Sequence, residues 1–253
     1  MRNRVNFIGI PLDNLTMSET LDRIENSIFS NKQIHHCVIN AGKVVKMQSD
    51  KKLQKSVISS DIINADGMSI VWAARLLGHE IKERVAGIDL MDNLVELAHE
   101  KKYKCFFLGA KEQVVKKIVD HYSEKYSNKI ISGYRNGYFD NYDEKMIIDQ
   151  IIKSKANLLF VAMTSPKKEM FLNKYKAELK SINLIMGVGG SFDVISGEVK
   201  RAPLFMQKIG LEWFYRFVQE PVRMWRRYII GNLKFIIIIF KAKFFHIKKN
   251  NLL

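Results

Sequence analysis

The segment LLFVAMTSPKKEMFLNKYKAELKSINLIMGVGG, residues 158–190, indicates the class of fold to expect. It opens with a short apolar run, Leu158–Met163, which predicts a buried strand. A longer amphipathic segment, Pro166–Leu179, predicts a helix, and a second apolar run, Ile182–Val188, predicts another strand. Two short apolar strands joined by a helix are typical of a β-α-β unit, in which the two strands lie parallel.

The same alternation continues toward the N-terminus. Further strands are predicted at Val5–Ile10, His36–Asn40, Asp61–Ala65, Cys105–Leu108 and Ile130–Gly133. Helices are predicted at Ser18–Ser30 (with Ser18 as N-cap), Lys43–Lys55, Met68–Leu77, Asp89–Lys101, Glu112–Tyr126 and Glu144–Ser154. We therefore expect an α/β fold that is Rossmann-like, with a largely parallel sheet covered by helices on both faces.

The character of the sequence changes after Gly197. Arg201 to Leu253 reads as nearly all helix, so we predict an α/β domain over residues 1–195 and a helical appendage over residues 196–253. The chain carries a net charge of +15, and Lys200 to Leu253 supplies +10 of it, from twelve Lys or Arg and two acidic residues. This excess predicts an anionic partner, mainly for the appendage: nucleic acid, an anionic membrane or a diphosphate.

Composition, cysteine placement and the N-terminal segment indicate a folded protein and its cellular compartment. At 47% hydrophobic and 26% charged residues, the chain is not a disordered one. Its two cysteines, Cys37 and Cys105, sit in apolar runs without metal-ligand spacing, which favours buried thiols in a reducing compartment. The N-terminal residues lack the apolar core and cleavage site of a signal peptide. We expect a cytoplasmic protein.

Ligands of open parallel sheets bind at the carboxyl ends of the strands, so the loops there are the candidate site. Asp66 follows a predicted strand and precedes Gly67 at the entry to a helix. A carboxylate there suits a general base, although an N-cap aspartate is the commoner explanation of such a position. Arg84 could clamp a phosphate, with Asp89 nearby; a surface arginine and another helix cap are the equal alternative.

Gly187, Gly189 and Gly190 form a glycine-rich strand end that suits a phosphate. It matches neither the dinucleotide fingerprint nor the Walker A loop. The chain also has no Asp-x-Asp motif of the kind that binds a metal–nucleotide-sugar complex. A bound diphosphate would therefore be neutralised by Arg, Lys or backbone N–H groups.

The appendage combines basic and apolar side chains. On one continuous helix, Arg216, Arg223, Arg227, Lys234 and Lys241 would form a single basic stripe. The apolar run Phe235–Phe240 between them is too short, and too often interrupted by polar residues, for a helix that spans a membrane. A helix lying in the membrane interface fits better, and an ordinary packed helix with a solvated basic face is the alternative.

Taken together, these motifs resemble the WecG/TagA/CpsF glycosyltransferases, glycosyltransferase family 26. The resemblance covers nearly the whole chain. Its blocks are Asn64-Ala65-Asp66-Gly67 with VWAARLLG, Arg84–Asp89, FFLGA at 106–110, GYRNGYF at 133–139, Gly187–Asp193, and Arg201-Ala202-Pro203 followed by GLEWFYR at 210–216 and Pro221–Arg227.

The resemblance implies an inverting enzyme that needs neither a metal nor another cofactor. It would move a sugar, often of the N-acetylmannosamine type, from UDP to a polyprenyl-diphosphate-linked acceptor in cell-surface polysaccharide or teichoic acid synthesis. Such an enzyme would attach peripherally to the inner face of the bacterial cell membrane. A homo-oligomer is a further expectation, since an exposed apolar appendage could also pack against another subunit.

The resemblance also implies roles for individual residues. Asp66 corresponds to the proposed base, and Asn40 to the first loop of the site. Asp193 falls in the glycine-rich block, and the appendage would bring Arg216, Arg223 and Arg226 or Arg227 over the site. Lys168 departs from the family, which usually has glutamine at this substrate-contacting position. A changed sugar or a loss of activity would each explain the lysine.

Two other functions stay open at this point. The net charge would suit a protein that binds nucleic acid or another anionic ligand, but no nucleic-acid motif is present and the charge lies beside a run of isoleucines. A non-catalytic scaffold of the same fold is the second alternative, and Lys168 is its only support.

Overall fold

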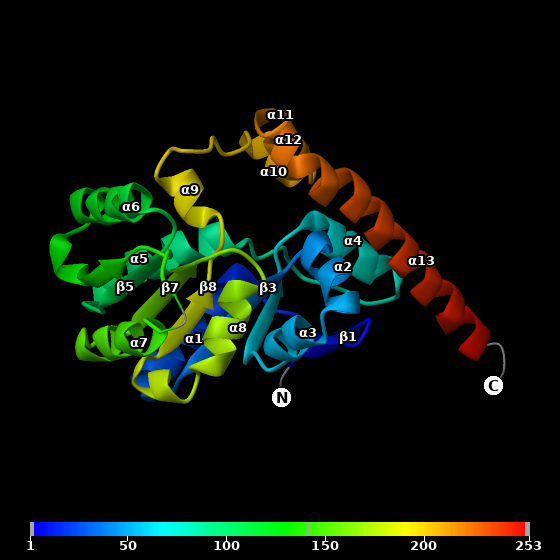
Figure 1. Cartoon of the computed structure of the whole chain (residues 1–253). Helices are drawn as coiled ribbons and strands as arrows, with labels where there is room; N and C mark the ends of the chain where they lie inside the picture. Colours follow the sequence, from blue (N-terminus) through cyan, green and yellow to red (C-terminus); the bar gives the residue numbers. More distant parts are fainter. Residues whose placement is uncertain (1–2, 141, 251–253) are drawn as a thin grey trace.

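The computed structural model describes residues 3–140 and 142–250, with the backbone alone for Arg223, Arg227 and residues 245–250. It confirms the predicted fold class: a parallel sheet of six strands with helices around it (Figure 1). Across the sheet the strands run in the order β4 (Ile62–Ala65), β3 (Ile34–Ile39), β8 (Leu184–Gly187), β7 (Leu158–Ala162), β5 (Cys105–Gly109) and β6 (Ile131–Arg135). Every neighbouring pair is parallel, so all six carboxyl ends lie at one edge.

The central strands are buried on both faces, which explains their continuous apolar sequences. Phe107, Phe160 and Met186 point to one face, whereas Leu108 and Val161 point to the other. The first face is covered by α1 (Met17–Phe29), α5 (Gly87–Lys101) and α6 (Glu112–Lys125). The second is covered by α2 (Ala41–Ser49), α3 (Lys51–Ile58), α4 (Met68–Leu76), α7 (Glu144–Lys153) and α8 (Lys167–Lys174).

The N-terminal elements differ from the prediction in three places. The single strand expected at Val5–Ile10 is wrong: β1 (Arg4–Phe7) and β2 (Ile10–Asp13) form an antiparallel hairpin. Helix α1 is capped by Thr16 in a capping box with Glu19, and not by Ser18. The helix expected at Lys43–Lys55 is broken at Asp50, which ends α2 and caps α3 by accepting from the backbone N–H of Leu53.

The appendage is helical, as predicted. It consists of α10 (Leu204–Lys208), α11 (Glu212–Gln219), α12 (Pro221–Trp225), a π-helical turn (Arg226–Ile230) and α13 (Gly231–Asn250). Figure 1 shows α13 as a long helix that passes over α2 and α4. Phe235 and Ile239 anchor α13 on the body, because both side chains are buried in the apolar cluster that contains Ile39 and Ala65. The division into residues 1–195 and 196–253 remains a prediction.

Within the described residues, none of the helices combines the length and the apolar character that a membrane crossing requires.

Candidate functional site

The carboxyl ends of β3 and β4 open into a cavity of about 490 Å³ that the appendage covers. Asn40 and Asp66 lie on the sheet side, and Arg84 lies on the loop before α5. Glu212 and Arg216 of α11 close the cavity from above, together with residues of α13. Body and appendage therefore build this site jointly.

Asp66 is not the N-cap of the following helix. That position belongs to Gly67, which makes no side-chain cap bond. The carboxylate of Asp66 instead accepts through Oδ1 from the backbone N–H of Gly87, at 3.1 Å. Gly87 is the first residue of α5, where unpaired N–H groups and the helix dipole favour a negative charge. No hydrogen bond to Oδ2 is found among the described residues, so this oxygen is left for a ligand.

Asn40 has a local role that was not anticipated. Its side chain caps α2, since Oδ1 accepts from the backbone N–H of Lys43 at 3.1 Å. This cap fixes the side chain at the edge of the cavity. The two Nδ2 donors and the second lone pair of Oδ1 remain for bonds to a substrate.

Arg84 connects the body to the appendage. Its Nη1 lies 3.0 Å from Oε2 of Glu212, and its Nη2 lies 3.9 Å from Oδ2 of Asp89. The other oxygen of Asp89 pairs with Arg201 at 2.6 Å. The cap alternative for Asp89 is wrong, because Ala86 occupies the N-cap of α5. These ion pairs hold the start of α5 and α11 together over the cavity.

Arg216 lies against the glycine-rich loop after β8. A Cβ atom placed on Gly190 would lie only 3.1 Å from its Nη2. The Nε of Arg216 faces Oε2 of Glu220 at 3.6 Å, too long for a hydrogen bond. Gly189 has a φ of 57°, a left-handed conformation that suits glycine. A guanidinium and small residues with exposed backbone thus meet at one point, an arrangement suited to a diphosphate.

Lys168 does not line this cavity. It is buried beneath the loop, and a Cβ atom on Gly187 would lie 3.1 Å from its Cδ. Its Nζ pairs with Oε1 of Glu169 at 2.6 Å, and the same oxygen lies 2.8 Å from Nζ of Lys43. Two cations and one carboxylate are therefore buried together under the glycine-rich loop.

The electrostatics of this buried cluster follow from its composition. Burial by itself would raise the pKa of Glu169, but the charges of Lys43 and Lys168 outweigh it and hold the pKa at about 2. Burial lowers the pKa of Lys168, and repulsion from Lys43 lowers it further. With both lysines protonated, the cluster carries one net positive charge behind the loop.

The remaining predicted site residues are placed as follows. Asp193 lies on α9 (Ser191–Ile195), directly after the glycine-rich loop, and its backbone oxygen accepts from the N–H of Val199. The side chains of Arg223 and Arg227 lie outside the described residues. Both cysteines are buried and unpaired.

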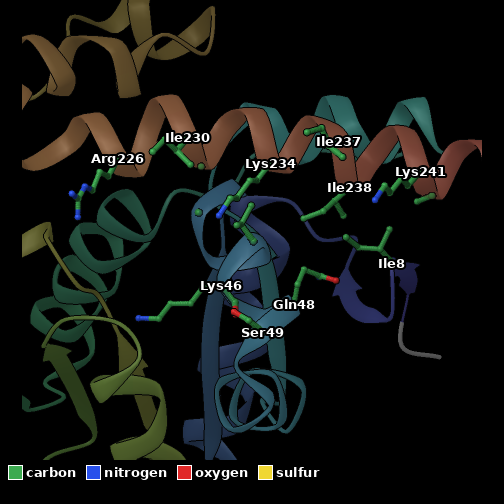
Figure 2. A pocket seen from close by; sticks show the side chains of 14 residues that line it. Ile8, Lys46, Gln48, Ser49, Arg226, Ile230, Lys234, Ile237, Ile238 and Lys241 are labelled. Atoms are coloured by element: carbon green, nitrogen blue, oxygen red, sulfur yellow. The ribbon is translucent and has the colours of Figure 1, made fainter.

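Arg226 points to a different hollow. With Lys46, Lys234 and Lys241 it lines a groove of about 900 Å³ between α2 and α13 (Figure 2). Of the predicted basic stripe, Lys234 and Lys241 share this groove, Arg216 does not, and the side chains of Arg223 and Arg227 lie outside the described residues. Arg216 belongs to a separate helix, since α11 ends before Pro221. The π-helical turn at Arg226–Ile230 also changes the direction in which the side chains after it point relative to those before it.

The sequence did not predict several of the residues that line the cavity. Trp72, Trp213 and Phe240 line it, and Glu212 closes it through Arg84. The block GLEWFYR pointed to the importance of α11 but not to the face that it presents. Among the side chains that the structure describes, no group of three or more His, Cys, Asp or Glu is arranged to hold a metal ion.

Comparison with known proteins agrees with this architecture. Residues 5–249 match the glycosyl transferase WecG/TagA/CpsF family. A protein of Bacillus subtilis (strain 168), named N-acetylglucosaminyldiphosphoundecaprenol N-acetyl-beta-D-mannosaminyltransferase, is 34% identical over 87% of this chain and 84% of its own length. A protein of the same name from Staphylococcus aureus (strain MW2) is 32% identical over 92% of this chain and 89% of its own length. The chain belongs to the WecG/TagA/CpsF family of glycosyltransferases.

Proposed function

We propose that this protein transfers an N-acetylmannosamine-type sugar from UDP to a polyprenyl-diphosphate-linked N-acetylglucosamine, with inversion at the anomeric carbon. The printed names of its relatives support the substrate class. The observation that carries the proposal is the carboxylate of Asp66, which is held by the N-terminus of α5 at the edge of the cavity beneath the appendage. The product would serve cell-surface polysaccharide or teichoic acid synthesis.

In the proposed reaction, Oδ2 of Asp66 takes the proton of an acceptor hydroxyl. The acceptor oxygen attacks the anomeric carbon from the face opposite to UDP. As the new carbon–oxygen bond forms, the bond to the UDP oxygen breaks, and UDP leaves with the electron pair. Inversion follows from this single displacement.

The departing diphosphate needs positive charge. Arg216 and the backbone N–H groups of the loop at Gly187–Gly190 would supply it, with the net positive charge of the Lys43–Glu169–Lys168 cluster behind them. Arg84 would act on the acceptor side of the cavity. In this proposal these cationic and N–H groups take the place of a metal ion, so we expect transfer to persist in EDTA.

Attachment to an anionic membrane is the second part of the proposal. The groove of Figure 2 gathers Lys46, Arg226, Lys234 and Lys241, and none of its described lining residues is acidic. On the outer side of α13, Leu233 and Phe244 are more than half exposed. A basic flank beside an apolar face is typical of a helix at a membrane interface, here the inner face of the cell membrane.

The alternatives receive less support. Lys168 was the only reason to consider a non-catalytic scaffold, and it lies in a buried ion cluster outside the cavity. Binding of nucleic acid would use the same basic groove, but apolar side chains such as Ile230 and Ile238 share its lining. Vesicle flotation and DNA retention at matched salt would separate these partners. Assembly into a homo-oligomer remains a prediction.

The central experiment is an assay of Asp66→Asn with UDP-N-acetylmannosamine and a soluble lipid-diphosphate acceptor. Removing a general base lowers the rate about 10²- to 10⁴-fold. Asp120→Asn, on the exposed side of α6, is the matched control. Near-wild-type turnover by Asp66→Asn would eliminate this residue as the base. Absence of UDP release by the wild type with every donor and acceptor tried would favour the scaffold.

A further inference from the structure

The cavity beside Asp66 changes character along its length. Polar side chains line the part next to the strand ends, where Asn40, Asp66 and Arg84 lie. Farther away the lining is apolar and comes from two helices. It consists of Trp72, Ala73 and Leu76 of α4 and of Phe235, Ile236, Ile239 and Phe240 of α13.

The apolar part is elongated. Met68 and Leu76, the two ends of α4, both line the cavity, as do Asn232 and Phe240 of α13. With a rise of about 1.5 Å per residue, each pair spans roughly 12 Å of helix. The cavity therefore continues as a slot between α4 and α13 that leads away from Asp66.

Three contacts hold the walls of this slot in place. Phe235 and Ile239 anchor α13 in the core. At the far end, Nζ of Lys243 donates to the backbone oxygen of Leu76 at 2.7 Å and fastens α13 to the end of α4. At the near end, Gly210 packs against Trp72 so closely that a Cβ atom would lie 2.6 Å from the ring. Contacts within the chain itself thus fix both walls of the slot.

The slot is open along one side. Trp72 is 49% exposed and Leu76 is 43% exposed on α4, while Ile236 is 48% and Phe240 is 51% exposed on α13. Large apolar side chains that face a common slot and remain half exposed leave an unfilled apolar surface. The exposed residues of the outer side of α13, such as Leu233, adjoin this rim. A chain lying in the membrane would therefore reach the slot sideways.

We infer that the slot between α4 and α13 binds the first isoprene units of the lipid-linked acceptor. This inference rests on the proposed function. The acceptor sugar would lie at Asp66, its diphosphate near Arg84, and the hydrocarbon chain along Trp72 and Ile236. A polar end beside the strand ends and an apolar slot beyond it match an acceptor that has a polar head and a prenyl chain. An apolar chain suits this slot, because the described side chains of α4 and α13 that line it are apolar along most of its length.

The test compares two acceptors in solution, without membranes and below their critical micelle concentrations. Both carry N-acetylglucosamine diphosphate, one on a farnesyl chain and one on a hexyl chain, with UDP-N-acetylmannosamine as donor. The readout is the ratio of kcat/KM for the farnesyl acceptor to kcat/KM for the hexyl acceptor. Apolar contacts that only the longer chain makes should give the wild type a ratio of roughly ten or more.

Two neighbouring isoleucines of α13 provide a matched pair. Ile236 lines the slot, whereas Ile237 is 46% exposed and lines the groove on the other flank of the helix. We expect Ile236→Asn to bring the ratio toward one and Ile237→Asn to keep it. Leu76→Ser, on the opposite wall, should lower the ratio without altering α13. Thermal unfolding of each variant identifies one that fails to fold, and the other wall then carries the test.

Each outcome has a definite meaning. If the wild type transfers to neither acceptor, the proposed function fails. If it transfers to both with equal efficiency, or if Ile236→Asn and Ile237→Asn lower the ratio equally, the inference alone is overturned. Competition by dihexanoyl phosphatidylglycerol that disappears in Ile236→Asn would assign the slot to a phospholipid acyl chain, which also overturns the inference.

Discussion

Oδ1 of Asp66 accepts a hydrogen bond from the backbone nitrogen of Gly87, at 3.1 Å, and this bond fixes the carboxylate at the N-terminus of α5. Gly87 occupies the first helical position, where proline fits well. Gly87→Pro would therefore remove the N–H donor while suiting the helix. We expect kcat to fall about tenfold, the loss for one hydrogen bond to a charged group.

Gly87→Ala serves as the control for this prediction. It keeps the N–H group, and its Cβ would lie 3.5 Å from Val38, an ordinary contact. Steady-state kinetics of both variants give the comparison. Equal losses of kcat in the two variants would show that the Asp66–Gly87 hydrogen bond has no part in turnover.

The buried cluster under the glycine-rich loop predicts an unequal response to two substitutions. Glu169→Gln leaves the ammonium groups of Lys43 and Lys168 buried without a carboxylate, so the free energy of unfolding should fall by about 3–5 kcal/mol. Lys168→Gln leaves Lys43 paired with Glu169 and removes the repulsion between the lysines. Its free energy of unfolding should be at or above that of the wild type.

Urea titration at neutral pH measures both values. Glu178→Gln, at an exposed glutamate nearby, should change the free energy of unfolding by no more than about 0.5 kcal/mol. Because the pKa of Glu169 is depressed from 4.5 to about 2, its stabilising contribution should be complete above pH 4.5 and disappear as the pH falls toward 2. A Glu169→Gln variant as stable as the wild type would contradict the role of the carboxylate.

Two buried histidines on β3 predict a loss of stability in mild acid. Burial lowers the pKa of His35 to about 3 and of His36 to about 4, from an ordinary value of 6.5. Between pH 6.5 and 5 the two histidines become protonated in the unfolded chain but stay neutral in the folded protein. The free energy of unfolding should therefore decrease as the pH falls, by up to roughly 1.4 kcal/mol per pH unit for each histidine.

His36→Gln isolates one of these contributions. The slope of unfolding free energy against pH should become shallower in this variant, because one proton fewer is taken up on unfolding. His121→Gln, at an exposed histidine of α6, should leave the slope unchanged. Urea midpoints at several pH values provide the measurement, and an unaltered slope in His36→Gln would refute the assignment.

Arg216 and Arg226 should separate catalysis from membrane attachment. Arg216 lies against Gly190, so Arg216→Gln should lower transfer to a water-soluble acceptor about a hundredfold. Arg226 lines the basic groove, so Arg226→Gln should have little effect in that assay. It should instead weaken binding to phosphatidylglycerol vesicles about fivefold, as one cation near an anionic surface contributes about 1 kcal/mol. Identical effects of the two variants in both assays would remove the distinction.

Much of the sheet could be predicted from sequence because its inner strands are buried on both faces. Cys105–Gly109 and Leu158–Ala162 are apolar throughout, and no competing periodicity obscures them. The N-terminal hairpin was missed because its turn uses a positive φ at Ile8, a β-branched residue that rarely adopts it. The break at Asp50 was missed because a continuous apolar period hid the second N-cap.

The site was predictable where the topology alone determines it. Asp66 and the loop at Gly187–Gly190 follow strands, and the carboxyl ends of parallel strands meet at one edge. The position of Lys168 was not predictable, because its partner Lys43 comes from a distant helix and draws it into the core through Glu169.

Phe235 and Ile239, which seat α13, belong to the same apolar cluster as Ile39 and Ala65, the last residues of β3 and β4. The residues that follow those two strands are Asn40 and Asp66. Helix α13 therefore completes the apolar floor under the loops that hold Asn40 and Asp66. A cut or a destabilising substitution in α13 would expose this apolar surface to water. We therefore expect the loops at Asn40 and Asp66 to become disordered first, although they are distant from α13 in sequence.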